Sequence, residues 1–203
     1  LGSYSGIYAL NVADIRGYIA NGTQLTHYLL VKKGVDSWAF HAKDNDLYVG
    51  GRTGLAKVDL ITHEYQPIVA FNDAYEDINN NVVTSIYHDN QGGVWLGSLV
   101  TGIYKWDPKL SLINNLRYKK SNPNRLSDNV VWSIEKSRKN DGLVWIATEN
   151  GLNALTLSTG QIERFLVDKQ NKSTSSESYI TQFMEDSSQR LWLLTSKGIR
   201  VFD

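Results

Sequence analysis

The stretch that decides the fold is GGVWLGSLVTGIYKWD, residues 92–107. It mixes glycines, β-forming residues and tryptophans in an order that fits neither an amphipathic helix nor a simple alternating strand. Similar stretches recur along the chain, each with a glycine before an apolar residue, and these glycines are Gly6, Gly54, Gly102, Gly151 and Gly198. Their spacings of 48, 48, 49 and 47 residues indicate a repeat architecture.

The repeat around residues 92–107 divides into four short strands. They are expected at residues 82–88, 94–98, 102–107 and 113–118. The turn at 89–93 supplies the Gly and Asn that a tight hairpin needs, and Pro108 prevents the third strand from continuing in a central ladder. The same order recurs in residues 37–68 and 129–165, whereas residues 179–203 stop after three strands. No window shows convincing helical periodicity.

Four-stranded units of this length are what β-propeller blades require. A single meander cannot bury both of its faces, so blades stack radially on one another. We expect the aromatic residue of each second strand to fill the space between blades, and these residues are Tyr48, Trp95, Trp145 and Trp192. The glycine after the second strand, as in Gly54, Gly102, Gly151 and Gly198, is expected to let the chain reverse closely, because a side chain there would crowd the adjacent blade.

In the first strand of this repeat, residues 82–88, alternate side chains are predicted to point to opposite faces of the sheet. Val83, Ser85 and Tyr87 are expected to face one way, and Val82, Thr84, Ile86 and His88 the other.

The sequence therefore predicts an all-β fold of β-propeller blades, each a four-stranded antiparallel meander with a period of about 48 residues. The expected units are 1–34, the last two strands of a preceding blade; 35–79, 80–125 and 126–175, three blades; and 176–203, a partial blade. Only three of these blades are complete, whereas closed propellers have about four to eight, so we expect an excerpt of a larger propeller. The alternative is a five-bladed ring that the N-terminal strands close against residues 179–203. A ring that does not close would leave sheet edges that favour self-association, so a homodimer is one possible state of the protein.

Composition sets limits on the function. The 203 residues are 41% hydrophobic, and Lys+Arg and Asp+Glu both number 21, so the net charge is zero and no nucleic-acid partner is indicated. No apolar run reaches the length of a membrane span. The absence of cysteine excludes disulfides and thiolate chemistry without identifying the compartment. Because Leu1 already lies inside a repeat, we expect further segments of the protein outside this sequence.

The stretch VVTSIYHDNQGGVWLGSLVTGIYKWDP, residues 82–108, resembles the repeat of the two-component regulator propeller family. Residues 129–156 and 179–203 resemble it as well, and the resemblance extends more loosely over the first two repeats. The sequence departs from the family pattern at a few positions. Tyr48 replaces the usual tryptophan, Ala147 and Leu194 replace a glycine, and the loop in GSLVTG has one added residue. These departures concern packing and loop shape.

The resemblance implies a location and a role. Repeats of this family usually belong to the extracytoplasmic sensor part of bacterial membrane signalling proteins, whose outputs are hybrid histidine kinases or diguanylate cyclases and whose ligands are often carbohydrates. It therefore implies a periplasmic location, as part of an inner-membrane protein. It also implies further propeller repeats and a membrane-linked output domain in the same chain, and a small-molecule ligand with carbohydrates as the leading class.

The sequence predicts no catalytic residue, no metal site and no cofactor. The histidines, none of which are at metal-ligand spacing, are His27, His41, His63 and His88. His41 and His88 occupy similar positions near the end of a first strand and are interpreted as polar groups at a hairpin mouth. Asp89, Glu185 and Asp186 lie at hairpin turns, where such side chains cap the backbone. Nucleophile-elbow, phosphate-loop and dinucleotide motifs are absent.

Binding is the expected activity, and propeller geometry indicates where to look. Connections from a fourth strand to the next first strand, and from a second to a third strand, share one edge and vary most between these repeats. The candidate ligand-binding residues there are Tyr4, Arg52, Asn79, Asn81, Asn129, Asn150, Tyr179 and Lys197. Amides, hydroxyls and rings suit a sugar, and they equally suit solvated loops.

Three functions of different class remain open. The first is a sensor module that passes ligand binding to a membrane-linked output domain. The second is a propeller enzyme acting on glycans, a hydrolase or a lyase, which needs a convergent acid–base cluster. The third is a scaffold that binds protein through its flat face. The fold alone does not choose among them.

Overall fold

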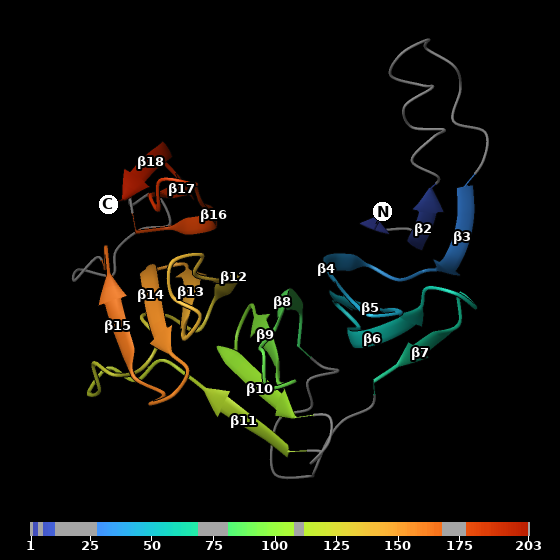
Figure 1. Cartoon of the computed structure of the whole chain (residues 1–203), viewed down its shortest axis with the longest axis horizontal. Helices are drawn as coiled ribbons and strands as arrows, with labels where there is room; N and C mark the ends of the chain where they lie inside the picture. The colour runs from blue at the N-terminus through green and yellow to red at the C-terminus, as the bar shows by residue number, and fades with distance from the viewer. Residues whose placement is uncertain are drawn as a thin grey trace.

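The computed structural model describes residues 2–3, 6–10, 28–68, 81–107, 112–167 and 178–202, and all regular structure in these ranges is β-strand. The described residues therefore contain no helix that is long and apolar enough to cross a membrane. Five antiparallel sheets follow one another along the chain (Figure 1). In each sheet, strands that are consecutive in sequence are neighbours in space.

The sheets are numbered here in chain order. The first consists of β1 (Gly2–Ser3), β2 (Gly6–Leu10) and β3 (Tyr28–Lys33). The second consists of β4 (Ser37–Lys43), β5 (Asp46–Gly51), β6 (Gly54–Asp59) and β7 (Tyr65–Pro67). The third consists of β8 (Val83–His88), β9 (Val94–Ser98), β10 (Ile103–Asp107) and β11 (Leu112–Leu116). The fourth consists of β12 (Val131–Lys136), β13 (Leu143–Thr148), β14 (Gly151–Thr156) and β15 (Ile162–Phe165), and the fifth of β16 (Ile180–Glu185), β17 (Leu191–Thr195) and β18 (Gly198–Phe202).

The sheets form an open arc (Figure 1). The strands β4, β8, β12 and β16 lie along its inner side, and β7, β11 and β15 lie along its outer side. The predicted all-β architecture of four-stranded propeller blades is thus confirmed. The first and fifth sheets lie at opposite ends of the arc, so the described residues do not form the closed five-bladed ring. The first sheet also has one strand more than the two expected, because β1 pairs with β2.

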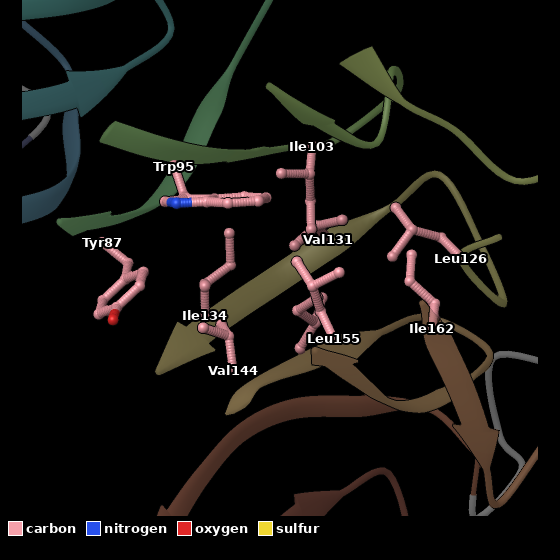
Figure 2. Close-up of a cluster of buried hydrophobic side chains, with 10 residues drawn as sticks. Tyr87, Trp95, Ile103, Leu126, Val131, Ile134, Val144, Leu155 and Ile162 are labelled. Carbon is pink, nitrogen blue, oxygen red and sulfur yellow. The ribbon is translucent and has the colours of Figure 1, made fainter. Parts of the chain in front are cut away.

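Hydrophobic cores lie between successive sheets, in contacts that we call seams. Leu55 of the second sheet packs with Val83 and Ile86 of the third in one cluster. In the next seam, the buried ring of Trp95 lies over Ile134 of the fourth sheet, as Figure 2 shows. Each sheet therefore depends on its neighbours for burial, as in other repeat folds.

The first strand of each described blade carries a β-bulge, which corrects the predicted alternation. The register of β8 with β9 shifts between Val83 and Ser85. Because a bulge inserts one extra residue, Val83 and Ile86 share the seam with the second sheet, whereas Tyr87 packs in the seam with the fourth. The shift recurs in β4, β12 and β16. The residues at the bulges are Trp38, Thr84, Trp132 and Thr181.

A small residue in the second strand lets the next sheet approach. A Cβ atom added at Gly50 would lie 2.5 Å from Val83, and one at Gly97 would lie 2.7 Å from Val131. Ala147 occupies the same position in the fourth sheet and is fully buried, while Leu194 in the fifth sheet is 45% exposed. The departures from the family pattern at these two positions thus concern how closely a following sheet can pack.

The glycine after the second strand serves a different contact from the one expected. Gly102 has a φ of 81°, and a Cβ atom there would lie 2.3 Å from the carbonyl oxygen of Leu116. At Gly151 the corresponding distance, to the carbonyl oxygen of Phe165, is 2.7 Å. The crowding therefore comes mainly from the outer strand of the same blade and not from the adjacent blade. Gly54 and Gly198 have φ angles of 81° and 106°, so all four glycines are left-handed.

A carboxylate fastens the first hairpin of the third sheet, in an arrangement that we call the clasp. Asp89 accepts hydrogen bonds from the backbone N–H groups of Gln91 and Gly93, and its other oxygen accepts one of 2.8 Å from Nε1 of Trp95. Burial opposes ionisation of Asp89, but these donors lower its pKa below the ordinary value. The clasp holds the indole that fills the seam.

The clasp recurs in the fifth sheet and is missing from the fourth. Asp186 accepts a 2.8 Å hydrogen bond from Nε1 of Trp192. At the corresponding hairpin of the fourth sheet stands Ser137, and Nε1 of Trp145 is buried with no partner among the described atoms. Glu185 of the fifth sheet instead reaches this hairpin and accepts from Ser137 and the neighbouring backbone.

Substitution of Gly102 by alanine is expected to destabilise the fold more than substitution of Gly160. Both glycines are left-handed, with φ of 81° and 69°, but a Cβ atom at Gly160 meets nothing within 4 Å. The G160A variant should lose about 1–2 kcal/mol for the left-handed backbone alone, and G102A should lose more because of the clash with Leu116. Urea unfolding of the two variants measures the difference, and equal losses would contradict it.

Trp95→Phe is expected to cost more stability than Trp145→Phe. Both changes remove an indole from a seam, but only Trp95 donates to a carboxylate. A hydrogen bond to a charged group contributes about 1.5–3 kcal/mol, so W95F should be less stable than W145F by an amount in this range. Chemical denaturation compares the two. An equal or larger loss in W145F would show that the clasp does not stabilise the blade.

Candidate functional site

The predicted binding residues that the structure describes lie along one edge of the arc, which we call the connection edge. It consists of the turns between second and third strands and the segments that enter the next first strands. Backbone hydrogen bonds join these parts: Gly102 N–H donates to the carbonyl of Asn129, and Gly151 N–H donates to that of Ser178. The structure therefore brings turns and connections together at the seams on both sides of the fourth sheet.

Two of the predicted amides serve internal contacts, and a third is buried. Nδ2 of the buried Asn81 donates to the hydroxyl of Tyr104 over 3.3 Å. Oδ1 of Asn129 accepts a 2.7 Å bond from the backbone N–H of Tyr118. Asn150 is only 8% exposed. These positions hold the connections in place, so the amide content of the loops was a weak guide to ligand contact.

Of the remaining predicted residues, Tyr4 and Asn79 lie outside the described residues. Lys197 is exposed in the β17–β18 turn. Arg52 is exposed in the β5–β6 turn, where its guanidinium lies 5.4 Å from the centre of the Trp38 ring and Nε lies 2.7 Å from a carboxylate oxygen of Asp36. Arg52 is therefore held by its own sheet and presents its side chain to solvent.

An aromatic pair forms at the connection edge between the fourth and fifth sheets. The rings of Trp132 and Tyr179 lie 6.0 Å apart with an interplanar angle of 53°. Nε1 of Trp132 is buried and has no hydrogen-bond partner among the described atoms. Beside the pair lies Glu149, whose pKa is raised by burial and by the charge of Asp128. The pKa of Tyr179 is likewise raised, first by burial and then by Glu149.

The sequence contained a signal for Trp132 that the loop argument missed. The residue lies in a strand, at the bulge, and not in a connection. The bulge position varies between Trp and Thr in the four repeats, whereas the position before it stays apolar or small. A variable aromatic inside an otherwise regular strand is therefore the pattern that indicates this site.

The carboxylates of the hairpins are engaged in structural contacts. Asp89 and Asp186 hold indoles and backbone N–H groups, and Glu185 caps the hairpin of the preceding sheet. In the part of the chain that the structure describes, no group of three or more His, Asp or Glu residues is arranged to hold a metal ion. The chemistry that the connection edge offers is a pair of aromatic rings beside carboxylates, which suits recognition of a hydroxyl-rich molecule.

Comparison with solved structures supports the propeller architecture. The chain matches the extracellular domains of two hybrid two component systems of B. thetaiotaomicron. For BT3049 the TM-score is 0.64 at 20% identity, over 84% of this chain and 22% of that domain. For BT4673 the TM-score is 0.66 at 20% identity, over 99% of this chain and 25% of that domain. The chain thus spans about a quarter or less of the length of these two domains.

A third similar structure is the β-propeller domain of Cps50 (Swd1) from Myceliophteria thermophila, with a TM-score of 0.54 at 16% identity over 82% of this chain and 51% of that one. No curated protein matches the chain by sequence. Residues 77–99 match the family described as two component regulator propeller. The recognition made from the sequence is therefore confirmed for one repeat: residues 77–99 match the suspected family, and the chain has a β-propeller fold.

Proposed function

We propose that this chain is the extracytoplasmic, ligand-sensing propeller region of a bacterial transmembrane signalling protein. The matched family and the likeness to extracellular domains of hybrid two component systems support this role. The chain itself binds and does not catalyse, and a kinase or cyclase domain of the same protein delivers the output. The ligand is a small molecule of the carbohydrate class.

The observation that carries the binding site is the aromatic pair of Trp132 and Tyr179 beside Glu149. Aromatic faces pack against the C–H faces of a sugar ring, and a carboxylate accepts from its hydroxyls. The unpartnered Nε1 of Trp132 supplies a donor that a ligand oxygen satisfies after a small movement of the ring. Arg52 and Lys197 extend the same edge toward its two ends.

The site lies where binding can change the contact between blades. Trp132 belongs to the fourth sheet and Tyr179 leads into the fifth, so a ligand held by both bridges one seam. A ligand that binds one arrangement of the two sheets more tightly shifts the population toward it. Such a shift, transmitted through successive seams, is the coupling that a membrane-linked output requires.

Further propeller repeats are the nearest partners in this proposal. In the third and fourth sheets the seam aromatics Trp95 and Trp145 pack against the next sheet. On the fifth sheet the equivalent Trp192 is 38% exposed, together with Met184 at 54% and Ile199 at 70%. This apolar face supports the proposal that another repeat of the same protein covers it.

Trp132→Ala is expected to weaken sugar binding at least about tenfold, which corresponds to about 1.4 kcal/mol. The measurement is isothermal titration of the chain with a panel of neutral and acidic oligosaccharides. Phe40→Ala, which removes a partly exposed ring from the second sheet, is the matched control and should leave affinity unchanged. Binding that survives in W132A would contradict the site, and a panel with no binder would contradict the ligand class.

The reading frame that encodes this chain is expected to encode an export signal, additional propeller repeats and a membrane-spanning segment followed by a kinase or cyclase domain. Sequencing the gene on both sides of the region for residues 1–203 checks this. A frame that instead joins the propeller to a hydrolase without a spanning segment would contradict the signalling role.

A further inference from the structure

Three aromatic rings meet in the seam between the second and third sheets. His41 of β4 stacks on His88 of β8, with ring centres 4.5 Å apart and an interplanar angle of 27°. The ring of Tyr48, in β5, lies against the His88 ring at a centre distance of 4.5 Å and an interplanar angle of 60°. The two imidazoles belong to different sheets and lie near the first hairpins, at the edge opposite to the connection edge. Their contact therefore helps to close this end of the seam.

The environment of His88 favours a neutral ring. Both ring nitrogens are buried and have no hydrogen-bond partner among the described atoms. A neutral imidazole has one N–H donor, whereas the protonated ring has two donors and a full charge, so protonation here adds an unsatisfied donor to a site with little water. Burial, then His41 and Lys43, lower the pKa of His88 to about 4. Burial and Lys43 also lower the pKa of His41.

Carboxylates are near the stack, but two of them are already paired. Asp46 of β5 lies 3.2 Å from Nζ of Lys57 of β6. Asp89, which follows β8, is held in the clasp and lies 3.7 Å from Nζ of Lys105 of β10. Asp44 of the β4–β5 turn is exposed, and like Asp89 it raises the pKa of His88 without overcoming burial. Lys43 opposes a second positive charge from its own strand.

A pocket beside the stack has room for the His88 ring when it is protonated. Its volume is about 390 Å³, and its lining includes His88, Tyr48, Asp44 and Asn90. A protonated His88 ring that leaves the stack would reach water and the carboxylate of Asp44 there. The structure shows the closed arrangement with stacked rings, and the pocket offers space for the ring outside the stack.

We propose that the seam between the second and third sheets is an acid-sensitive contact, in which protonation of the stacked His41–His88 pair opens the hairpin end of the seam. This device goes beyond ligand sensing at the connection edge, because it involves different residues at the opposite edge. It makes the packing of two blades depend on the acidity of the surroundings.

The direction of the pH dependence follows from proton linkage. The open seam binds protons with the ordinary pKa of histidine, 6.5, and the closed seam binds them only near the lowered value of about 4. The closed seam is therefore fully favoured above about pH 6.5, and its advantage falls as the pH decreases from there toward about 4. Carboxylates such as Asp89 have lowered pKa values, so their contribution to the stability of the fold is lost only in more acidic solution.

Amide hydrogen exchange of the whole chain, followed by mass spectrometry from pH 7 to about 4 and corrected for intrinsic exchange rates, tests the proposal. Peptides from β4, β5 and β8 should lose protection in acid, by about tenfold per pH unit for one coupled proton. Peptides from the fourth sheet should keep their protection over the same range. Equal losses in all sheets would overturn the proposal, because they report global unfolding.

Two variants sharpen this test. His88→Phe keeps a ring in the stack and cannot be protonated, so its β4 and β8 peptides should stay protected in acid. His63→Asn changes an exposed turn histidine with a φ of 61°, a conformation that asparagine tolerates, and should respond as the unmodified chain does. An unchanged acid response in H88F would overturn the proposal. Should H88F fail to fold, the imidazole proton resonances decide, since titration of His88 near pH 6.5 would refute it.

Discussion

The fold depends on the contact of one sheet face with the next. A four-stranded meander has two faces and cannot cover either of them itself, so each sheet is stable only against a neighbour. The small residues Gly50, Gly97 and Ala147 let first strands approach, and the rings of Trp95 and Trp145 fill the remaining space. Both proposed functional sites lie in seams, because these are the places where two otherwise independent units meet.

The arrangement of repeats could be predicted because it rests on local sequence. Evenly spaced glycines, β-forming residues and hairpin turns place each strand of the third sheet within a residue or two of its observed bounds. Two details could not be predicted in this way. The bulge in β8 changes which residues share a face with Val83, without any glycine to mark it. The crowding at Gly102 comes from Leu116, whose approach depends on the outer strand.

The candidate site depends less directly on local sequence than the fold does, for a physical reason. Polar residues in connections can serve a ligand or the backbone, and the sequence does not distinguish these uses. Asn81 and Asn129 proved to hold the protein's own groups, whereas Trp132 lies in a strand that the sequence marked as structural. A residue released from the ladder by a bulge is free to serve binding, and the pairing register shows which residue this is.

The bonds from Gly102 to Asn129 and from Gly151 to Ser178 have a consequence for how such proteins diverge. Both partners are main-chain groups, so the bond itself does not require a particular side chain at the accepting residue of the connection, although the donors Gly102 and Gly151 must stay glycine. Connections can therefore change in composition, and gain or lose residues before the joined position, while the relative placement of the blades is conserved. A propeller built in this way can acquire a new ligand specificity through its loops while the packing of its blades stays the same.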